Sequence, residues 1–112
     1  MKSDDELKQL LAKMLPEVLW IHSDYDQSKN IRWKEREVKL DSGLRFNQQD
    51  RAVYTNELLH LCSLVEAELD RDKRQSYVVN LLRTIGYSVH SSISATWQQR
   101  TEALSQVLEV TL

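Results

Sequence analysis

Glycine and proline are scarce in this chain, and that scarcity constrains its fold more than any other feature of the sequence. Only two glycines and one proline occur among the 112 residues. Sheets need many tight turns, and tight turns rely on these two residue types. Helices joined by short links need fewer of them. The sequence therefore predicts a mostly α fold, a small bundle of four or five short helices.

Length and composition indicate a single folded domain spanning residues 1–112. Hydrophobic residues make up 41% of the chain and charged residues 29%, a balance typical of globular proteins. No apolar run approaches the ~20 residues needed to cross a bilayer. The acidic start of the chain argues against a secretory signal, and the one cysteine, Cys62, excludes an internal disulfide. We therefore expect a cytoplasmic protein with no membrane partner.

Apolar residues recur at helical spacing in several segments. The first helix begins at a capping box formed by Ser3 and Glu6, and Pro16 interrupts it. A second helix is expected to start near Asn47 or Asp50 and to carry the apolar stripe from Tyr54 to Leu69. A third is expected from about 72 to 86, with Val78, Leu81, Leu82 and Ile85 facing the core, and a fourth from about 95 to 110.

Residues 22–46 fit no element cleanly. The stretch from Ile31 to Leu40 is compatible with an imperfectly alternating strand or with a weakly amphipathic helix, and we favour the helix. A small hairpin within residues 18–46 would instead make the fold α+β, which is the fallback prediction. Asp41, Ser42 and Gly43 form the clearest break in the chain.

Part of this segment has the spacing of a calcium-binding loop. Oxygen-bearing side chains stand at Asp24, Asp26, Ser28 and Glu35, which are positions 1, 3, 5 and 12 of an EF-hand pattern. Lys29 occupies the position where that pattern requires glycine. We therefore favour an acidic turn whose aspartates cap backbone donors, and we predict no metal and no cofactor.

No complete catalytic motif is present. The chain contains no glycine-rich phosphate loop, no G-x-S-x-G elbow and no H-E-x-x-H pair. His60 stands beside an apolar helical stripe, where a half-buried structural histidine is more common than a catalytic one. We therefore expect no enzymatic activity.

Aromatic and arginine side chains concentrate between residues 20 and 46, and these residue types dominate the energies of protein interfaces. The acidic stretch that follows is a second candidate surface, suited to a basic partner. The predicted partner-binding residues are Trp20, Tyr25, Arg32, Trp33, Arg36, Glu57, Glu66 and Glu68. The sequence thus favours a small interaction protein, such as an inhibitor, an immunity-type protein or an adaptor, that binds another protein. A homodimer is a further expectation, in which a two-fold contact covers an apolar helical stripe and pairs the acidic with the basic regions.

The alternative is a DNA-binding regulator. Residues 78–100 have the outline of a helix-turn-helix, with a helix ending at Gly86 and a second one starting in a serine cluster. Its nucleic-acid contacts would come from Ser94, Gln98, Gln99 and Arg100. The net charge of −2 weighs against this alternative, because DNA affinity depends heavily on phosphate neutralisation.

Overall fold

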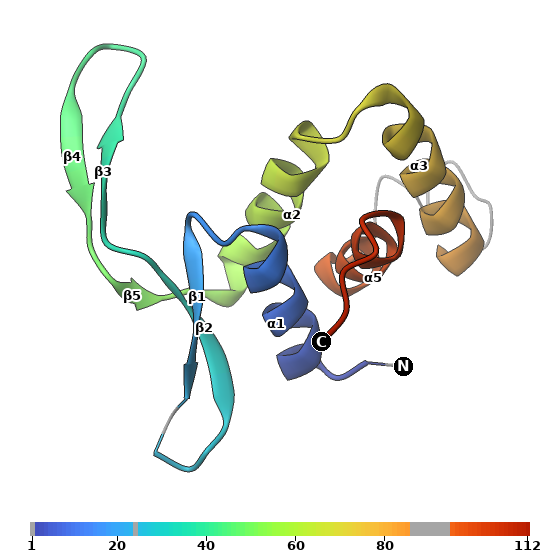
Figure 1. Cartoon of the computed structure of the whole chain (residues 1–112), viewed down its shortest axis with the longest axis horizontal. Coiled ribbons are helices and arrows are strands. Elements are labelled where there is room, and N and C mark those ends of the chain that lie inside the picture. The colour runs from blue at the N-terminus through green and yellow to red at the C-terminus, as the bar shows by residue number, and fades with distance from the viewer. Residues whose placement is uncertain (1, 24, 86–94) are drawn as a thin grey trace.

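Strand pairing between residues 19 and 52 makes this protein α+β. The computed structural model describes residues 2–23, 25–85 and 95–112. These residues form four α-helices, a short 3-10 turn and five strands in two antiparallel sheets (Figure 1). The predicted mostly α bundle is therefore wrong. The fallback hairpin within residues 18–46 was nearer, although the strands continue to residue 52.

Helix α1 (Asp4–Met14) begins as the sequence predicts. Ser3 and Glu6 form the expected capping box, which satisfies backbone donors of the first turn. The helix ends at Leu15, directly before Pro16, which could not continue its hydrogen bonding. Its apolar stripe is buried, and Leu10 and Leu11 are fully inaccessible to solvent.

The first sheet packs one face against α1. It consists of β1 (Leu19–Ser23), β2 (Lys29–Trp33) and β5 (Arg51–Ala52), in the order β1–β2–β5. Leu19 pairs with Trp33, and both side chains are buried with Ile31. Ile31 and Trp33 point inward while Arg32 between them points outward, which is the two-residue period of a strand. The helix favoured for residues 31–40 is therefore wrong.

The second sheet is a two-stranded hairpin that projects away from the helices (Figure 1). It comprises β3 (Arg36–Lys39) and β4 (Arg45–Gln48), and we call residues 36–48 the arm. Val38 pairs with Phe46. The turn closes through hydrogen bonds from Leu40 N to Leu44 O (2.8 Å) and from Gly43 N to Leu40 O (2.9 Å). Gly43 has a φ of +89°, which a side-chain-bearing residue adopts only at a cost.

Three further helices complete the described part of the chain. A 3-10 turn (Thr55–Glu57) leads into α2 (Leu58–Ala67), so the helix start predicted at Asn47 or Asp50 is wrong. Helix α3 spans Arg71–Ile85, and Lys73 N donates to Asp70 Oδ1 (2.8 Å) at its start. Helix α5 spans Trp97–Val107.

The core lies where α1 and the first sheet meet the helices. Leu61, Cys62, Thr101 and Leu104 are completely buried there, as their predicted stripes require. Two expectations fail on the periphery. Tyr54 precedes α2 and is 61% exposed, and Val78 on α3 is 45% exposed.

The arm makes the molecule broad and flat. Its extents are 42 × 41 × 23 Å and its radius of gyration is 15.1 Å. A compact chain of this length would have a radius near ~13 Å. A substantial part of the chain therefore lies outside the compact body, and Figure 1 shows that both the arm and the end of the β1–β2 hairpin extend away from the helices.

Candidate functional site

The outer face of the first sheet gathers residues that the sequence singled out separately. Trp20 on β1 pairs with Arg32 on β2, and His22 pairs with Asn30. Since Leu19, Ile31 and Trp33 are buried on the other side, these four side chains occupy the face turned away from α1. We call Trp20, His22, Tyr25, Arg32 and Asp50 the sheet face.

Asp50 fixes two of these side chains. Its Oδ1 accepts hydrogen bonds from Arg32 Nε (2.8 Å) and from Trp20 Nε1 (3.3 Å). The hydrogen bond from Arg32 is the main reason that the pKa of Asp50 is lowered, and the one from Trp20 adds to it. The ring of His22 meets that of Trp20 edge to face, with centroids 5.1 Å apart. Contacts within the protein thus hold Trp20, His22 and Arg32 in place on the sheet face.

Tyr25 lies in the turn that joins β1 and β2. Its side chain is fully exposed. Asp26 Oδ1 accepts hydrogen bonds from Ser28 N (3.0 Å) and Ser28 Oγ (2.7 Å), so the aspartate caps a local turn as expected. Strands flank this turn where an EF-hand requires helices, so the EF-hand arrangement is wrong; Asp24 lies outside the described residues.

The arm carries a second, apolar surface. The register places Val38 beside Phe46 on one side of the hairpin, with Arg36 and Gln48 below them and Leu40 and Leu44 above. We call these six residues the arm face. Leu40, Leu44 and Phe46 are 45%, 68% and 48% exposed. Charged residues, including the ion pair of Glu37 and Arg45 (3.5 Å), occupy the opposite side.

A cleft of about 620 Å³ separates the base of the arm from α2. Trp33, Val38, Phe46 and Leu64 are its apolar lining residues, and the other seven, including Arg36 and His60, are polar or charged. The cleft thus offers both apolar surface and hydrogen-bonding groups to another molecule.

Arg51 and Glu57, which both line this cleft, form an ion pair with each other. Arg51 donates two hydrogen bonds of 2.7 Å to the two oxygens of Glu57, and Tyr54 N donates a third (2.9 Å). The bidentate contact with Arg51 is the main reason that the pKa of Glu57 falls to about 2. The indole of Trp33 contributes to that lowering, although Trp33 Nε1 makes no hydrogen bond of normal geometry within the described residues.

Comparison of the chain with protein-family models, with characterised proteins and with solved structures found no significant match.

Two of the three acidic residues predicted to bind a partner already make hydrogen bonds within the protein. Glu57 is engaged by Arg51, and Glu66 Oε1 accepts hydrogen bonds from Tyr77 OH (2.8 Å) and Arg100 Nη1 (3.1 Å). This network ties α2 to α3 and α5 and leaves Glu68 exposed beside it. Glu66 therefore has a structural role, which its position in the sequence did not reveal.

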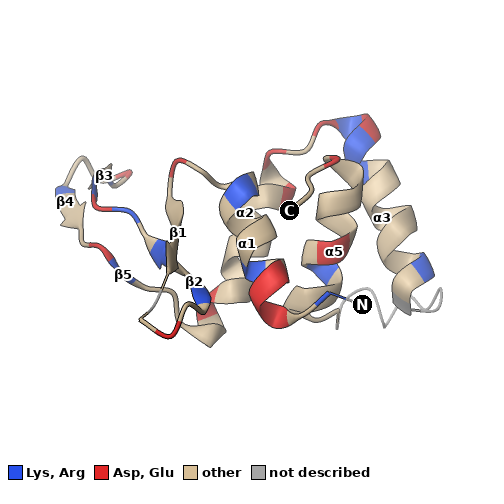
Figure 2. Ribbon diagram, turned by 60° about the horizontal axis from the view of Figure 1, so that its bottom comes forward, with Lys and Arg blue, Asp and Glu red and all other residues tan. Residues whose placement is uncertain are grey.

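Two of the four residues predicted to contact DNA already make hydrogen bonds within the protein. Gln99 closes the capping box of α5 with Thr96, and Arg100 donates to Glu66 and to Ala95 O (3.1 Å). Ser94 and the turn expected after Gly86 lie outside the described residues. Lys and Arg are interspersed with Asp and Glu along the ribbon (Figure 2).

The described part of the chain offers little support for metal binding or for a reactive thiol. It contains no group of three His, Cys, Asp or Glu side chains arranged to hold a metal ion. Cys62 is buried against Thr101, and burial raises the pKa of its thiol to about 11. None of the described helices combines the length and apolar character needed to cross a bilayer.

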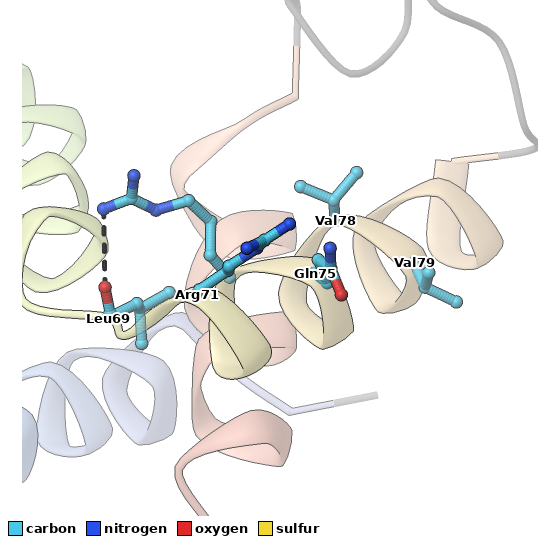
Figure 3. Close-up of a pocket in the computed structure, with 6 residues that line it drawn as sticks. Leu69, Arg71, Gln75, Val78 and Val79 are labelled. Atoms are coloured by element: carbon cyan, nitrogen blue, oxygen red, sulfur yellow. Dashed lines mark hydrogen bonds between the residues drawn. The ribbon is translucent and has the colours of Figure 1, made fainter.

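A shallow hollow of about 610 Å³ lies on α3 near its start (Figure 3). Leu69, Val78 and Val79 provide its apolar part, and Arg71, Arg74 and Gln75 surround them. Arg74 Nη2 is held by Leu69 O at 3.4 Å, as the dashed line marks. The hollow lacks a carboxylate or histidine and offers no constellation for catalysis.

The sequence missed the arm face. Only Arg36 of its six residues was among the predicted partner-binding residues. A signal was present, because apolar residues alternate with polar ones at 38 and 40 and again at 44 and 46, on either side of Ser42 and Gly43.

Proposed function

We propose that this chain is a non-enzymatic, cytoplasmic protein-interaction module, of the inhibitor, immunity or adaptor kind, that binds another protein through its sheet face. The observation that carries the proposal is the pairing of Trp20 with Arg32 on the outer face of a three-stranded sheet, next to a turn that exposes Tyr25. These are the residue types that contribute most to binding at protein interfaces.

The order of the sheet face supports this proposal. Arginine and tryptophan side chains normally lose conformational freedom when a partner immobilises them. Here Asp50 already restrains Arg32 and Trp20, and His22 packs against the indole. Binding would therefore require little further ordering. Glu68 and the rest of the acidic stretch stay a secondary candidate contact for a basic partner.

The chain's single cysteine supports the cytoplasmic assignment. Cys62 is free and buried, and its thiol is stabilised in the protonated form. A reduced thiol is compatible with an intracellular setting.

Affinity capture from a lysate of the cells that make the protein tests this proposal. The bait variant Tyr25→Ala combined with Arg32→Glu removes two contacts of the sheet face, and Lys29→Ala changes an exposed residue on the same strand as a control. We expect a stoichiometric protein partner that nuclease does not release, that the double variant fails to retain and that Lys29→Ala still retains.

Two outcomes would contradict the proposal. Equal capture by the native chain and the double variant would exclude the sheet face as the binding surface. Capture that disappears with nuclease would favour the alternative based on Gln98, Gln99 and Arg100. The alanine variant of Trp33 is not a suitable test. Only 6% of Trp33 is exposed, so removing its indole would leave a cavity in the core and disturb folding.

A further inference from the structure

We propose that two copies of this chain associate through their arm faces, packed face to face and pointing in opposite directions. This contact goes beyond the proposed function, since it uses none of the residues of the sheet face. Its occupant is a second copy of the same chain.

The instability of an isolated hairpin is the first argument. A two-stranded ribbon alone is only marginally stable in water, and a third strand or a covering layer is needed to hold it. The arm has no such layer in the described part of the chain, because the largest tertiary contacts of β3 and β4 are with each other. Leu40, Leu44 and Phe46 are each close to half exposed or more. Face-to-face packing of two ribbons would cover these side chains on both copies.

The tip and the base of the arm differ in shape, and this difference favours two arms that point in opposite directions. Leu40 and Leu44 form an apolar projection at the tip, and the cleft at the base exposes the apolar residues Trp33, Phe46 and Leu64 among polar ones. A twofold axis through the middle of two opposed arm faces places the tip of each arm over the cleft of the other. Such a contact is self-complementary and closes at two copies.

The distribution of charge follows the same symmetry. Arg36 is exposed at the base of the arm face, and Asp41 is exposed in the turn at the tip. Antiparallel packing brings Arg36 of each copy toward Asp41 of the other, so that opposite charges meet at both ends of the contact. Parallel packing would bring like charges together at both ends. The charges of the arm thus favour one orientation of the second copy.

Sedimentation equilibrium of the purified full chain, from micromolar to a few hundred micromolar, tests the proposal. The native protein is expected to approach twice its mass of 13.2 kDa as its concentration rises. Phe46→Glu places a charge in the middle of the apolar contact and should leave the protein monomeric. Lys39→Glu adds the same charge on the opposite side of the arm, next to Arg45 and outside the cleft, and this control should still dimerise. Circular dichroism verifies that both variants fold.

A charge swap tests the orientation. Arg36→Asp and Asp41→Arg should each raise the dimer Kd roughly tenfold, because the twofold axis repeats the lost ion pair. The double variant restores both pairs with reversed signs and should recover the native Kd. A native protein that remains monomeric throughout overturns the proposal. So does a dimer that survives Phe46→Glu, or a double variant as weak as the two single ones. None of these results bears on partner capture by the sheet face, so the two proposals fail separately.

Discussion

Gly43 shows how one residue governs the shape of the arm. Its φ of +89° closes the turn between β3 and β4, and no heavy atom lies within 4 Å of the position that a Cβ would take. Space therefore does not require glycine here. The backbone conformation does, because a side chain makes positive φ values unfavourable.

Replacing Gly43 by alanine should loosen the turn by about 1 kcal/mol, since alanine pays the steric cost of positive φ. Exchange of the Leu40 amide hydrogen, which is bonded to Leu44 O, should accelerate roughly fivefold. Asparagine tolerates this conformation better, so Gly43→Asn should have a smaller effect. Equal exchange rates in the native protein and both variants would contradict this account of the turn.

The ion pair of Glu57 with Arg51 makes the stability of the fold depend on pH. Its pKa in the folded protein is about 2, below its ordinary value of 4.5, so ionised Glu57 stabilises the fold above pH 4.5. As the pH falls from 4.5 toward 2, protonation removes this contribution, on the order of 2 kcal/mol after allowance for the partial exposure of Arg51. Urea unfolding across this range should show the loss.

The Glu57→Gln variant is the control for that experiment. It should be less stable than the native chain at pH 7, and the difference between the two proteins should shrink as the pH approaches 2. A difference that stays constant with pH would mean that the ion pair with Arg51 does not set the pKa of Glu57.

At the scale of elements, local signals located the apolar stripes of the helices but did not reveal the strands. The capping box of Ser3 and Glu6 and the stripes of α2 and α5 depend only on neighbours within the helix, so the sequence specifies them. The pairing of Trp20 with Arg32 depends on two segments that are separated in the chain. No local pattern fixes such a pairing, and the scarcity of glycine argued against it.

Two turn details explain why scarce glycine did not prevent a sheet. Gln27 adopts a φ of 67° in the turn between β1 and β2, and Gly43 alone serves the arm. The sequence thus needed one glycine for two hairpins. Of the candidate site, the residue types of the sheet face were predictable from the aromatic and arginine cluster, whereas their common face and their contact with Asp50 were not.

The hydrogen bonds of Glu66 join α2 to α3 and α5. Removing the hydroxyl of Tyr77 should therefore lower the free energy of unfolding. Tyr77→Phe leaves the buried ring in place and deletes the hydrogen bond from Tyr77 OH to Glu66 Oε1 (2.8 Å). The variant should lose about 1 kcal/mol of unfolding free energy. Tyr25→Phe is the matched control, because Tyr25 is fully exposed and should show no loss. Equal stability of the two variants would remove the network from the account of how α2, α3 and α5 hold together.

At the scale of the whole molecule, the helices and the sheets have separate tasks. The helices and the inner side of the first sheet form the core, and the residues proposed to bind lie on the outer side of that sheet and on the arm. A dimer formed through the arms would carry two sheet faces. Such a pair could bind two copies of a partner, or a symmetric partner with increased avidity.

Site-specific photo-crosslinking in the cells that make the protein tests the central claim most directly. A photoreactive phenylalanine analogue at Tyr25 reports on the sheet face, and the same analogue at Val79 reports on the distant hollow of α3. Both positions are exposed in the folded chain. We predict a covalent adduct with a partner protein from position 25 and none from position 79. Adducts from position 79 alone would contradict the assignment of the sheet face as the binding surface.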